Sequence, residues 1–426
     1  MRVVDAQRGP DQQVIAAALE SVGARVDLGE AAVDADRVAD SDLVVTSPGW
    51  RPDHPLLRAA ADRGVSVWGE VELAWREQSS PRARWLGVTG TNGKTTTTEM
   101  LAAMIAVAGV RGGAAGNIGR PLVEAACVDE PAAELLAVEL SSFQLHWSES
   151  VRPAAGALLN LADDHLDWHG SFAAYAEAKA KVWGDGSTIA VHNADDARVV
   201  RLLGDRPGVG FTLGPPSPGR LGVRHGALVD EAFGAGRLVG VDELRVSGEH
   251  NVANALAAAA LALAAQLPAA AVRDALRRFT AGAHRNAVVA EVGGVRYVDD
   301  SKATNPHAAA ASLRAYPRVV WIAGGLNKGL GFDDLVRETR AHLVAAVLIG
   351  RCAAEIHDAL RRHAPDVPVR TVADLHTAVQ AARGVAQPGD VVLLAPAAAS
   401  MDMFRNYAER GDVFAAAAQA LQEGPQ

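Results

Sequence analysis

With 426 residues, the chain is long enough for two to four domains, each with its own hydrophobic core. Charged residues make up 21% and hydrophobic residues 49% of the sequence, the balance of an ordinary soluble globular protein. The net charge of −9 argues against a nucleic-acid partner, because no basic surplus exists to displace phosphate counterions.

Signals for a membrane or an oxidising compartment are weak in the sequence. The longest apolar run, Val252–Gln266, is too short to span a bilayer, and Met1–Asp5 does not resemble the apolar core of a signal peptide. Cys127 and Cys352 lie far apart and fit no metal-binding or redox spacing. We therefore expect a cytoplasmic protein without a membrane association or a disulfide.

Short apolar strands alternate with longer helical stretches rich in alanine and leucine, which is the pattern of parallel α/β domains. In chain order we expect strands at Val3–Val4, Leu43–Thr46, Val65–Trp68, Trp85–Val88, Leu135–Glu139, Val319–Ile322, Ala345–Ile349 and Val391–Leu394, and helices at Gln12–Ser21, Pro55–Arg63, Thr96–Val107, Phe172–Trp183 and Val252–Gln266. A polar break near residue 80 and a new segment near residue 282 predict three domains, 1–80, 81–281 and 282–426. The Gly/Pro-rich stretch Gly204–Gly222 is interpreted as a surface excursion of the middle domain.

A phosphate-binding loop follows the strand Trp85–Val88. Its residues are Gly90, Thr91, Asn92, Gly93, Lys94, Thr95 and Thr96. Glycines allow a close backbone approach to phosphate, and the helix that follows supplies free N–H groups and a positive dipole. Lys94 would reach the β- and γ-phosphates and the Thr95 hydroxyl would bind Mg²⁺. A Gly-rich turn alone could be a tight strand-to-helix connection, but Lys-Thr at the helix start favours nucleotide binding.

This loop resembles the ATP loop shared by the Mur ligases and the folylpolyglutamate synthases, and four later segments narrow the resemblance to the D-glutamate-adding Mur ligases. These segments are Glu139–Leu145, Asn160–Asp167, His250–Ala255 and Asp300–Asn305, and the closing motif is Ala395–Tyr407. The resemblance runs from about residue 3 to the end. It implies three α/β domains: a Rossmann-like N-terminal domain, a central ATP-binding domain with a parallel sheet, and a Rossmann-like C-terminal domain.

The resemblance also implies two magnesium ions. Thr95 and Glu139 would bind the first ion, and His165 with a carbamylated Lys179 would bind the second. From the residues alone, Glu139 could cap the next helix, and His165 in its acidic run could be a surface histidine paired with a carboxylate. Composition does not distinguish Lys179 from Lys181. Carbamylation needs a neutral amine at some instant, so we expect a depressed pKa for Lys179.

The resemblance assigns the remaining residues to the binding of either ATP or D-glutamate. Asn251, Asn254, Arg285, Asp300 and Lys302 match residues on the ATP side, with Arg285 as a phosphate clamp when the domains close. Thr304, Lys328, Ser400 and Tyr407 match the residues that hold D-glutamate. Lys328 would bind the side-chain carboxylate of D-glutamate, and its alternative interpretation is a solvated loop lysine.

The function implied is ligation of D-glutamate to UDP-N-acetylmuramoyl-L-alanine through an acyl phosphate, with Lys94, His165, Lys179 and Arg285 as catalytic residues and a monomer as the active form. One alternative is another amide ligase of the superfamily, such as the diaminopimelate-adding enzyme or folylpolyglutamate synthase. The segment Asp300–Asn305 argues against both. A non-catalytic nucleotide-binding protein is a rival of another class.

The N-terminal domain departs from the family. There, a strand and a Gly-rich turn into a helix precede the strand that ends in Asp, and Met1–Asp5 matches that second strand. We therefore expect the first βα unit to be absent, through a late start codon or a true loss. The candidate UDP-sugar contacts are Asp5, Ser47, Pro48, Gly49 and Asn117, and we expect weak sugar-nucleotide binding beside intact ATP binding.

Overall fold

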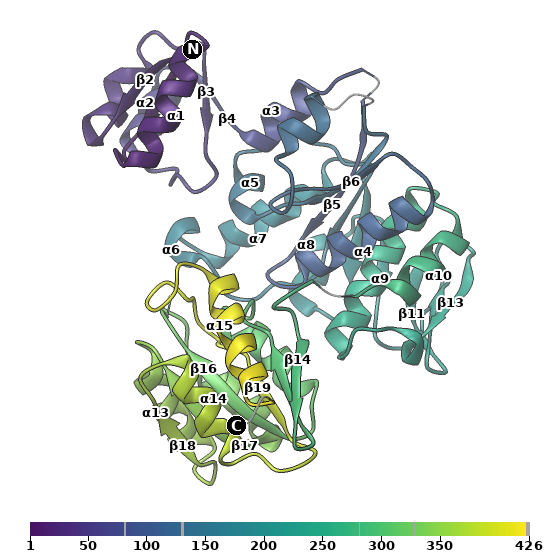
Figure 1. The fold of residues 1–426 in the computed structure, drawn as a ribbon. Helices are drawn as coiled ribbons and strands as arrows, with labels where there is room; N and C mark the ends of the chain where they lie inside the picture. The colour runs from purple at the N-terminus through teal and green to yellow at the C-terminus, as the bar shows by residue number, and fades with distance from the viewer. Residues whose placement is uncertain (81, 129–131, 281, 328, 423–426) are drawn as a thin grey trace.

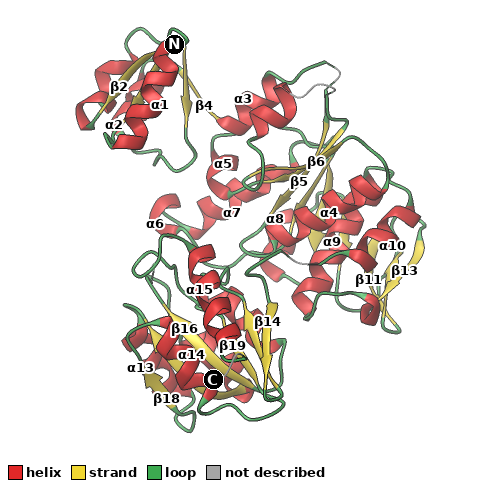
Figure 2. Ribbon diagram, in the orientation of Figure 1, coloured by secondary structure: helices red, strands yellow, loops and turns green. Residues whose placement is uncertain are grey.

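The computed structural model describes residues 1–80, 82–128, 132–280, 282–327 and 329–422. Figure 1 shows an N-terminal lobe, a central lobe built on the largest sheet, and a C-terminal lobe that carries the chain end. Helices and strands alternate through all three lobes, as Figure 2 makes plain. The architecture is the mixed α/β arrangement that the sequence pattern predicts.

The N-terminal lobe holds two separate parallel pairs of strands instead of one sheet. Strands β1 and β2 pair, and β3 pairs with β4. The elements are β1 (Arg2–Asp5), α1 (Pro10–Ser21), β2 (Arg25–Leu28), η1 (Glu30–Val33), η2 (Ala35–Val38), β3 (Leu43–Thr46), α2 (Pro55–Asp62) and β4 (Ser66–Gly69). Leu56 and Leu57 of α2 pack with Val33 and Val38 in a small core. Helix α1 buries no residue, so this lobe has little apolar interior.

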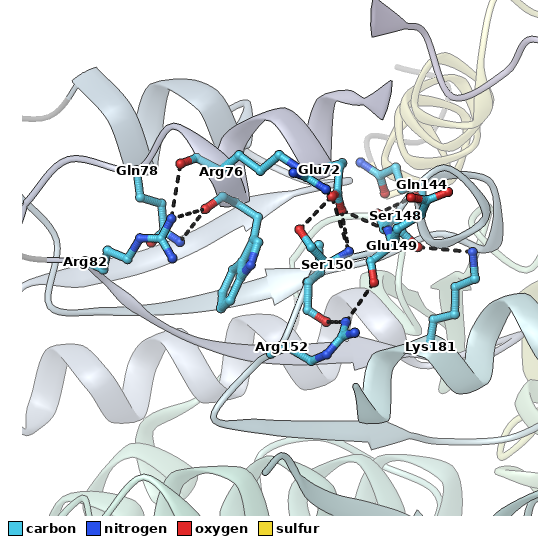
Figure 3. A network of polar contacts seen from close by, with 12 residues as sticks. Glu72, Arg76, Gln78, Arg82, Gln144, Ser148, Glu149, Ser150, Arg152 and Lys181 are labelled. Carbon is cyan, nitrogen blue, oxygen red and sulfur yellow. Dashed lines mark hydrogen bonds and ion pairs between the residues drawn. The ribbon is translucent and has the colours of Figure 1, made fainter. Parts of the chain in front are cut away.

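Helix α3 (Glu70–Arg76) leaves the N-terminal lobe and is anchored on the central lobe by a buried carboxylate. Glu72 is fully buried and accepts hydrogen bonds from the backbone N–H of Glu149 at 2.9 Å and from the Ser150 hydroxyl at 2.6 Å. Arg76 donates to the same carboxylate at 2.7 Å. Figure 3 shows these groups converging on Glu72. Burial alone would raise the pKa of Glu72, but the hydrogen bonds outweigh burial and lower it.

The central lobe is built on a nine-stranded sheet in the order β13-β12-β11-β10-β9-β8-β5-β7-β6. Its strands are β5 (Arg84–Thr89), β6 (Gly112–Gly116), β7 (Leu135–Glu139), β8 (Ala155–Leu158), β9 (Ile189–Asn193), β10 (Gly208–Phe211), β11 (Arg220–Arg224), β12 (Ala227–Asp230) and β13 (Gly236–Gly240). Pairing is parallel from β6 to β11, and β12 and β13 continue the sheet as antiparallel strands. The carboxyl ends of β5, β7 and β8 therefore meet at one edge, where ligands bind in such sheets.

Helices cover both faces of this sheet. They are α4 (Lys94–Val107), η3 (Glu124–Val128), α5 (Ser142–His146), α6 (Leu166–His169), α7 (Phe172–Ala180), η4 (Lys181–Trp183), α8 (Ala197–Leu203), η5 (Val241–Glu243), α9 (Glu249–Ala264) and α10 (Ala269–Arg278). Helix α9 is buried along most of its length, and its alanines allow close packing on α4 and the sheet. A helix apolar on all sides belongs in a core, which explains the longest apolar run of the sequence.

The stretch Gly204–Gly222 is not a surface excursion, and that interpretation was wrong. It contributes strand β10 and the start of β11 to the large sheet, with Phe211 and Leu221 almost completely buried. Glycines and prolines mark the turns around these strands. Their density hid two strands of only 4 and 5 residues.

The C-terminal lobe contains a six-stranded sheet in the order β14-β15-β19-β16-β17-β18. Its elements are β14 (Ala287–Val292), β15 (Val295–Asp299), α11 (Pro306–Arg314), β16 (Val319–Gly324), α12 (Asp333–Thr339), η6 (Arg340–His342), β17 (Leu343–Ile349), α13 (Ala353–His363), β18 (Val369–Thr371), α14 (Leu375–Arg383), β19 (Val391–Leu394) and α15 (Tyr407–Ala420). Only β14 is antiparallel to its neighbour. Within the described ranges of the chain, every helix is too short or too polar to cross a lipid bilayer.

The buried carboxylate of Glu72 generates the first prediction. In Glu72→Ala the Ser150 N–H and hydroxyl lose their acceptor inside the protein, so we expect the variant to lose about 2 to 4 kcal/mol of unfolding free energy. Urea unfolding measures the loss, and hydrogen exchange at Glu149 and Ser150 locates it. Glu77→Ala, which removes an exposed carboxylate from the end of α3, is the control and should stay within about 0.5 kcal/mol. Equal stability of the two variants would contradict the anchoring role of Glu72.

Candidate active site

The loop between β5 and α4 has the geometry of a phosphate cradle. Gly93 adopts φ +82° directly before Lys94, and a Cβ atom there would collide with Oδ1 of Asn254 on α9. Gly90 lies so close to Leu159 and Asn160 that a Cβ would sit 3.0 Å from the Leu159 side chain. Gly93 is therefore favoured by its backbone angle and by space, and Gly90 has little room for a side chain. The backbone N–H groups at the start of α4 are left available for an anion.

Two lysines converge on this loop. The ammonium group of Lys94 donates to the carbonyl oxygens of Gly90 at 3.0 Å and Thr91 at 2.9 Å. The ammonium group of Lys179, which is 2% exposed, donates to the same Gly90 oxygen at 2.7 Å. Burial, together with the positive charge of Lys94, lowers the pKa of Lys179 well below its ordinary value. Burial also lowers the pKa of Lys94, against the attraction of Glu139 and Asp164.

Helix α7 positions Lys179 through a second residue of the same face. Tyr175, four residues earlier and 1% exposed, hydrogen-bonds through its hydroxyl to the Thr91 hydroxyl at 2.8 Å. The Lys179 ammonium group lies 4.8 Å from the centre of the Tyr175 ring. Asn160 closes the cradle from the other side, since its side chain bonds the backbone N–H of Asn92 at 2.8 Å and its carbonyl at 3.1 Å. Tyr175 and Asn160 were not among the predicted site residues, although the spacing of Tyr175 and Lys179 indicates a shared helix face.

Glu139 ends β7 beside the cradle and is 1% exposed. Its Oε1 accepts a hydrogen bond from the Asn117 side chain at 2.8 Å, while its Oε2 is buried with no hydrogen-bond partner. A buried carboxylate oxygen without a donor is costly unless a cation compensates it. Thr95, also buried, is the second residue of α4 and directly follows Lys94 of the same loop. The donor set therefore fits one Mg²⁺, which needs only one or two protein ligands besides phosphates and water.

Asn117 was predicted to contact the UDP-sugar, and the structure places its side chain on Glu139 instead of leaving it free. Its backbone N–H also donates to the Glu139 carbonyl at 2.9 Å. The turn after β6 thus holds the carboxylate of the candidate metal site in place. Asn117 is exposed beside Glu139.

His165 lies directly before the short helix α6 and adopts φ +53°, an uncommon angle for a residue other than glycine. Its backbone N–H donates to Asp164 Oδ1 at 3.0 Å, and its ring lies 4.7 Å from the ring of Phe143. Among the described residues, no three histidine, cysteine or carboxylate side chains group as a metal site. A second metal here would therefore need further ligands from a substrate or from a modified lysine.

Asn251 and Asn254 lie on the buried face of α9, beside the cradle. The Asn254 side chain donates to the Asn251 side chain at 3.3 Å, and the Asn251 side chain donates to the Ser247 carbonyl at 2.7 Å. Asn254 also lies against Gly93, as its clash with a Cβ there demonstrates. Asn254 therefore borders the phosphate loop, and Asn251 is bonded to Asn254.

The C-terminal lobe contacts the same loop at Asn92. Asn305 hydrogen-bonds to the Asn92 side chain at 3.1 Å, and His307 does so at 2.8 Å. Arg285 contacts the central lobe through Glu99 of α4, with two hydrogen bonds of 2.7 and 2.8 Å from one guanidinium nitrogen. The guanidinium of Arg285 is thus bound by a carboxylate in this structure. Glu99 and His307 lie outside the motifs of the sequence analysis, and Asn305 belongs to the segment Asp300–Asn305 but was given no role there.

Asp300 and Lys302 follow β15. Asp300 accepts a hydrogen bond from the Ser312 hydroxyl and one from the backbone N–H of Asn286 at 3.2 Å, and burial raises its pKa to about 6. Lys302 donates to the Tyr407 hydroxyl at 3.2 Å, and its ammonium group lies 4.4 Å from the centre of that ring. Lys302 and Tyr407, predicted for different substrates, are therefore neighbours.

Thr304 and Ser400 come from two loops that are bonded to each other and to a third. Backbone hydrogen bonds join Ala397 to Ala303 at 2.9 Å and Ala399 to Leu326 at 2.8 and 3.0 Å. Arg410, 1% exposed, donates to the Ser301 carbonyl at 2.8 Å and the Ala398 carbonyl at 3.2 Å. Arg410 was missed, because a single arginine in a helix carries no sequence signal of burial. Lys328 lies outside the described residues.

The candidate sugar-nucleotide residues of the N-terminal lobe fall in two places. Asp5 ends β1, where its carboxylate accepts a hydrogen bond from the Gln7 backbone at 2.8 Å. Ser47, Pro48 and Gly49 form the turn after β3. The Gly49 carbonyl accepts a hydrogen bond from the Trp168 indole at 3.1 Å, so this turn touches the helix that follows His165.

The chain is similar in sequence to proteins of a known family. Residues 88–262 match the Mur ligase middle domain, and residues 284–398 match the Mur ligase glutamate ligase domain. The UDP-N-acetylmuramoylalanine--D-glutamate ligase of Frankia casuarinae is 60% identical over 99% of this chain and 89% of that protein. The protein of the same name from Mycolicibacterium vanbaalenii is 52% identical, over 93% of this chain and 89% of its own.

Solved structures share the fold at lower identity. The UDP-N-acetylmuramate-alanine ligase MurC of Thermotoga maritima aligns with a TM-score of 0.59 at 20% identity, over 98% of this chain and 99% of that one. The MurF ligase of Thermotoga maritima, solved with ADP, aligns with a TM-score of 0.61 at 17% identity, over 92% and 98% of the two chains. Both sequence matches and shared fold lead to one conclusion: the chain belongs to the Mur ligase family.

Proposed function

We propose that this protein ligates D-glutamate to UDP-N-acetylmuramoyl-L-alanine at the expense of ATP, in the synthesis of peptidoglycan precursors. The observation that carries the proposal is the 60% identity, over 99% of this chain, to a ligase named for that reaction. The Mur ligases are ATP-dependent, and the phosphate cradle around Gly93 and Lys94 is consistent with that requirement. We propose the cytoplasm as its location and a monomer as the active form, with no membrane or nucleic-acid partner.

The first chemical step forms an acyl phosphate. The terminal carboxylate of the UDP-sugar attacks the γ-phosphorus of ATP, and ADP leaves with the electrons of the broken bond. Lys94 stabilises negative charge on the transferring group, and Arg285 adds a second cation once it leaves Glu99. Thr95 and Glu139 would hold one Mg²⁺, and His165 with a carbamylated Lys179 a second. When bound, these ions neutralise phosphate charge.

The second step forms the amide. The D-glutamate amine attacks the acyl carbon, phosphate leaves, and the amine releases a proton. We assign Thr304, Lys328, Ser400 and Tyr407 to the amino acid, and Asn251, Asn254, Asp300 and Lys302 to the ATP side. Asp5, Ser47, Pro48, Gly49 and Asn117 are assigned to the UDP-sugar. The reacting groups come from three lobes, so closure of the lobes is expected to control turnover.

Turnover of the purified protein tests the proposed function. With UDP-N-acetylmuramoyl-L-alanine, ATP, Mg²⁺ and D-glutamate, we expect phosphate release that stops when any one component is omitted. L-glutamate, diaminopimelate and L-lysine in place of D-glutamate should give background rates. Equal rates with another amino acid would assign the chain to a different amide ligase, and ATP binding without any turnover would favour the non-catalytic alternative.

The cradle predicts a specific effect of a methyl group at Gly93. Gly93→Ala should weaken ATP binding by at least about 100-fold, because the Cβ collides with Asn254 and the backbone angle becomes unfavourable. Calorimetric titration with ATP is the measurement. Gly109→Ala is a matched control. Gly109 also has a positive φ, of +71°, but a Cβ added there would meet nothing within 4 Å. The assignment fails if Gly93→Ala binds ATP as tightly as Gly109→Ala.

The buried lysine predicts a chemical rescue. The neutral Lys179 amine can attack CO₂, forming a carbamate and releasing a proton, and its lowered pKa favours that neutral form. Lys179→Ala should lose activity by at least about 100-fold, and acetate should restore part of it by replacing the carbamate. Lys181→Ala, at the exposed end of the same helical segment, should keep its activity. Full activity of Lys179→Ala without acetate would disprove the modification.

A further inference from the structure

A short contact joins the N-terminal lobe to the central lobe beside His165. The Arg51 guanidinium donates to the Asp167 carbonyl at 2.6 Å, and the Trp168 indole N–H donates to the Gly49 carbonyl at 3.1 Å. Both bonds connect the turn after β3 with helix α6, which lies at the left edge of the central lobe between the N-terminal and C-terminal lobes (Figure 1). Asp53 orients the guanidinium through two further bonds of 3.0 Å.

Helix α6 depends on its contacts for its position. It has only 4 residues and begins directly after His165, whose φ is +53°. So short a helix is not stable by itself. Within the central lobe, His169 of α6 hydrogen-bonds to the Ser142 hydroxyl at 3.0 Å. The Trp168 ring lies 4.8 Å from the Phe143 ring, which in turn lies 4.7 Å from the His165 ring. Trp168 therefore contacts the turn after β3 through its indole N–H. Its ring contacts Phe143, which packs on His165.

In the proposed function, the two ends of this contact belong to binding sites for different ligands. The turn that contains Ser47 and Gly49 is assigned to the UDP-sugar, and His165 to a metal ion on the phosphates of ATP. A shift of the turn must pull on α6, because two hydrogen bonds and an orienting carboxylate tie them together. Neither Arg51 nor Trp168 was assigned a role in either site.

We infer that Arg51 and Trp168 are positioning residues that couple the sugar-nucleotide turn of the N-terminal lobe to His165 of the central lobe. This inference rests on the proposed function for the identity of the two ligands. The hydrogen bonds and the aromatic contacts carry the coupling itself. Loss of either residue should loosen the turn and α6 together, leaving the phosphate cradle and the amino-acid loops unchanged.

The kinetic test uses two conservative variants. Trp168→Phe keeps an aromatic ring but removes the N–H, and Arg51→Gln shortens the side chain and removes its charge. We expect the KM for UDP-N-acetylmuramoyl-L-alanine and the Mg²⁺ concentration for half-maximal rate each to rise about 5- to 10-fold, the effect of one lost hydrogen bond. The KM for D-glutamate should stay within about twofold, a split that general damage to the fold would not produce.

Matched controls separate this effect from loss of an indole or a charge. Trp75→Phe changes a half-buried tryptophan that packs on Trp85, with ring centres 5.0 Å apart, and Arg58→Gln removes an exposed charge from the same N-terminal lobe. Both controls should match the unsubstituted protein. The inference is overturned if Trp168→Phe and Arg51→Gln behave like them, or if only kcat falls.

Hydrogen exchange tests the coupling without turnover. In the free protein, Arg51→Gln should accelerate exchange of the amides at Trp168, His169 and Gly170 several-fold, although the substitution lies in the other lobe. Arg58→Gln should not. Unchanged exchange in Arg51→Gln would overturn the coupling even if ligase activity is confirmed. Faster exchange in a protein that proves inactive as a ligase would keep the coupling and refute only the proposed function.

Discussion

Two buried ammonium groups that share one carbonyl oxygen are the constraint around which the site is organised. Lys94 and Lys179 both donate to the Gly90 carbonyl, and burial together with the positive charge of Lys94 lowers the pKa of Lys179. Such a pair is tolerable only where acceptors and negative charge are close, which Glu139 and Asp164 provide. A bound phosphate would attract Lys94 away from the carbonyl, and a carbamate would convert Lys179 from a cation to an anion. Both changes relieve the same repulsion.

The surrounding packing keeps this pair in place. Tyr175 ties α7 to Thr91, Asn160 closes the loop, and Asn254 leaves room for nothing larger than glycine at position 93. The outer lobes reach this region through a few polar contacts: Asn305 on Asn92, Arg285 on Glu99, and the Gly49–Arg51 turn on α6. Contacts of this size hold a lobe without fixing it permanently, which suits a site that must open for substrates.

Much of this could be predicted because the signals are local. The phosphate loop is recognisable from glycine, lysine and threonine at a strand-to-helix junction, and strands such as Leu135–Glu139 and Val391–Leu394 have the bounds expected from their apolar runs. Glu139 at a strand end could be placed near the loop, since parallel strands share an edge. The strands within Gly204–Gly222 were missed, because turn residues dominate that stretch.

The sequence by itself determined the α/β class, the cradle and the order of the site motifs, because each depends on residues close together in the chain. Only the tertiary structure decided which distant groups share a bond. The pairing of Arg285 with Glu99, the buried Arg410 among three loops, and the anchoring of α3 by Glu72 each join segments far apart in sequence. Whether such a polar group is buried and paired depends on tertiary packing, and tertiary packing of a polar group produces no periodic pattern in the sequence.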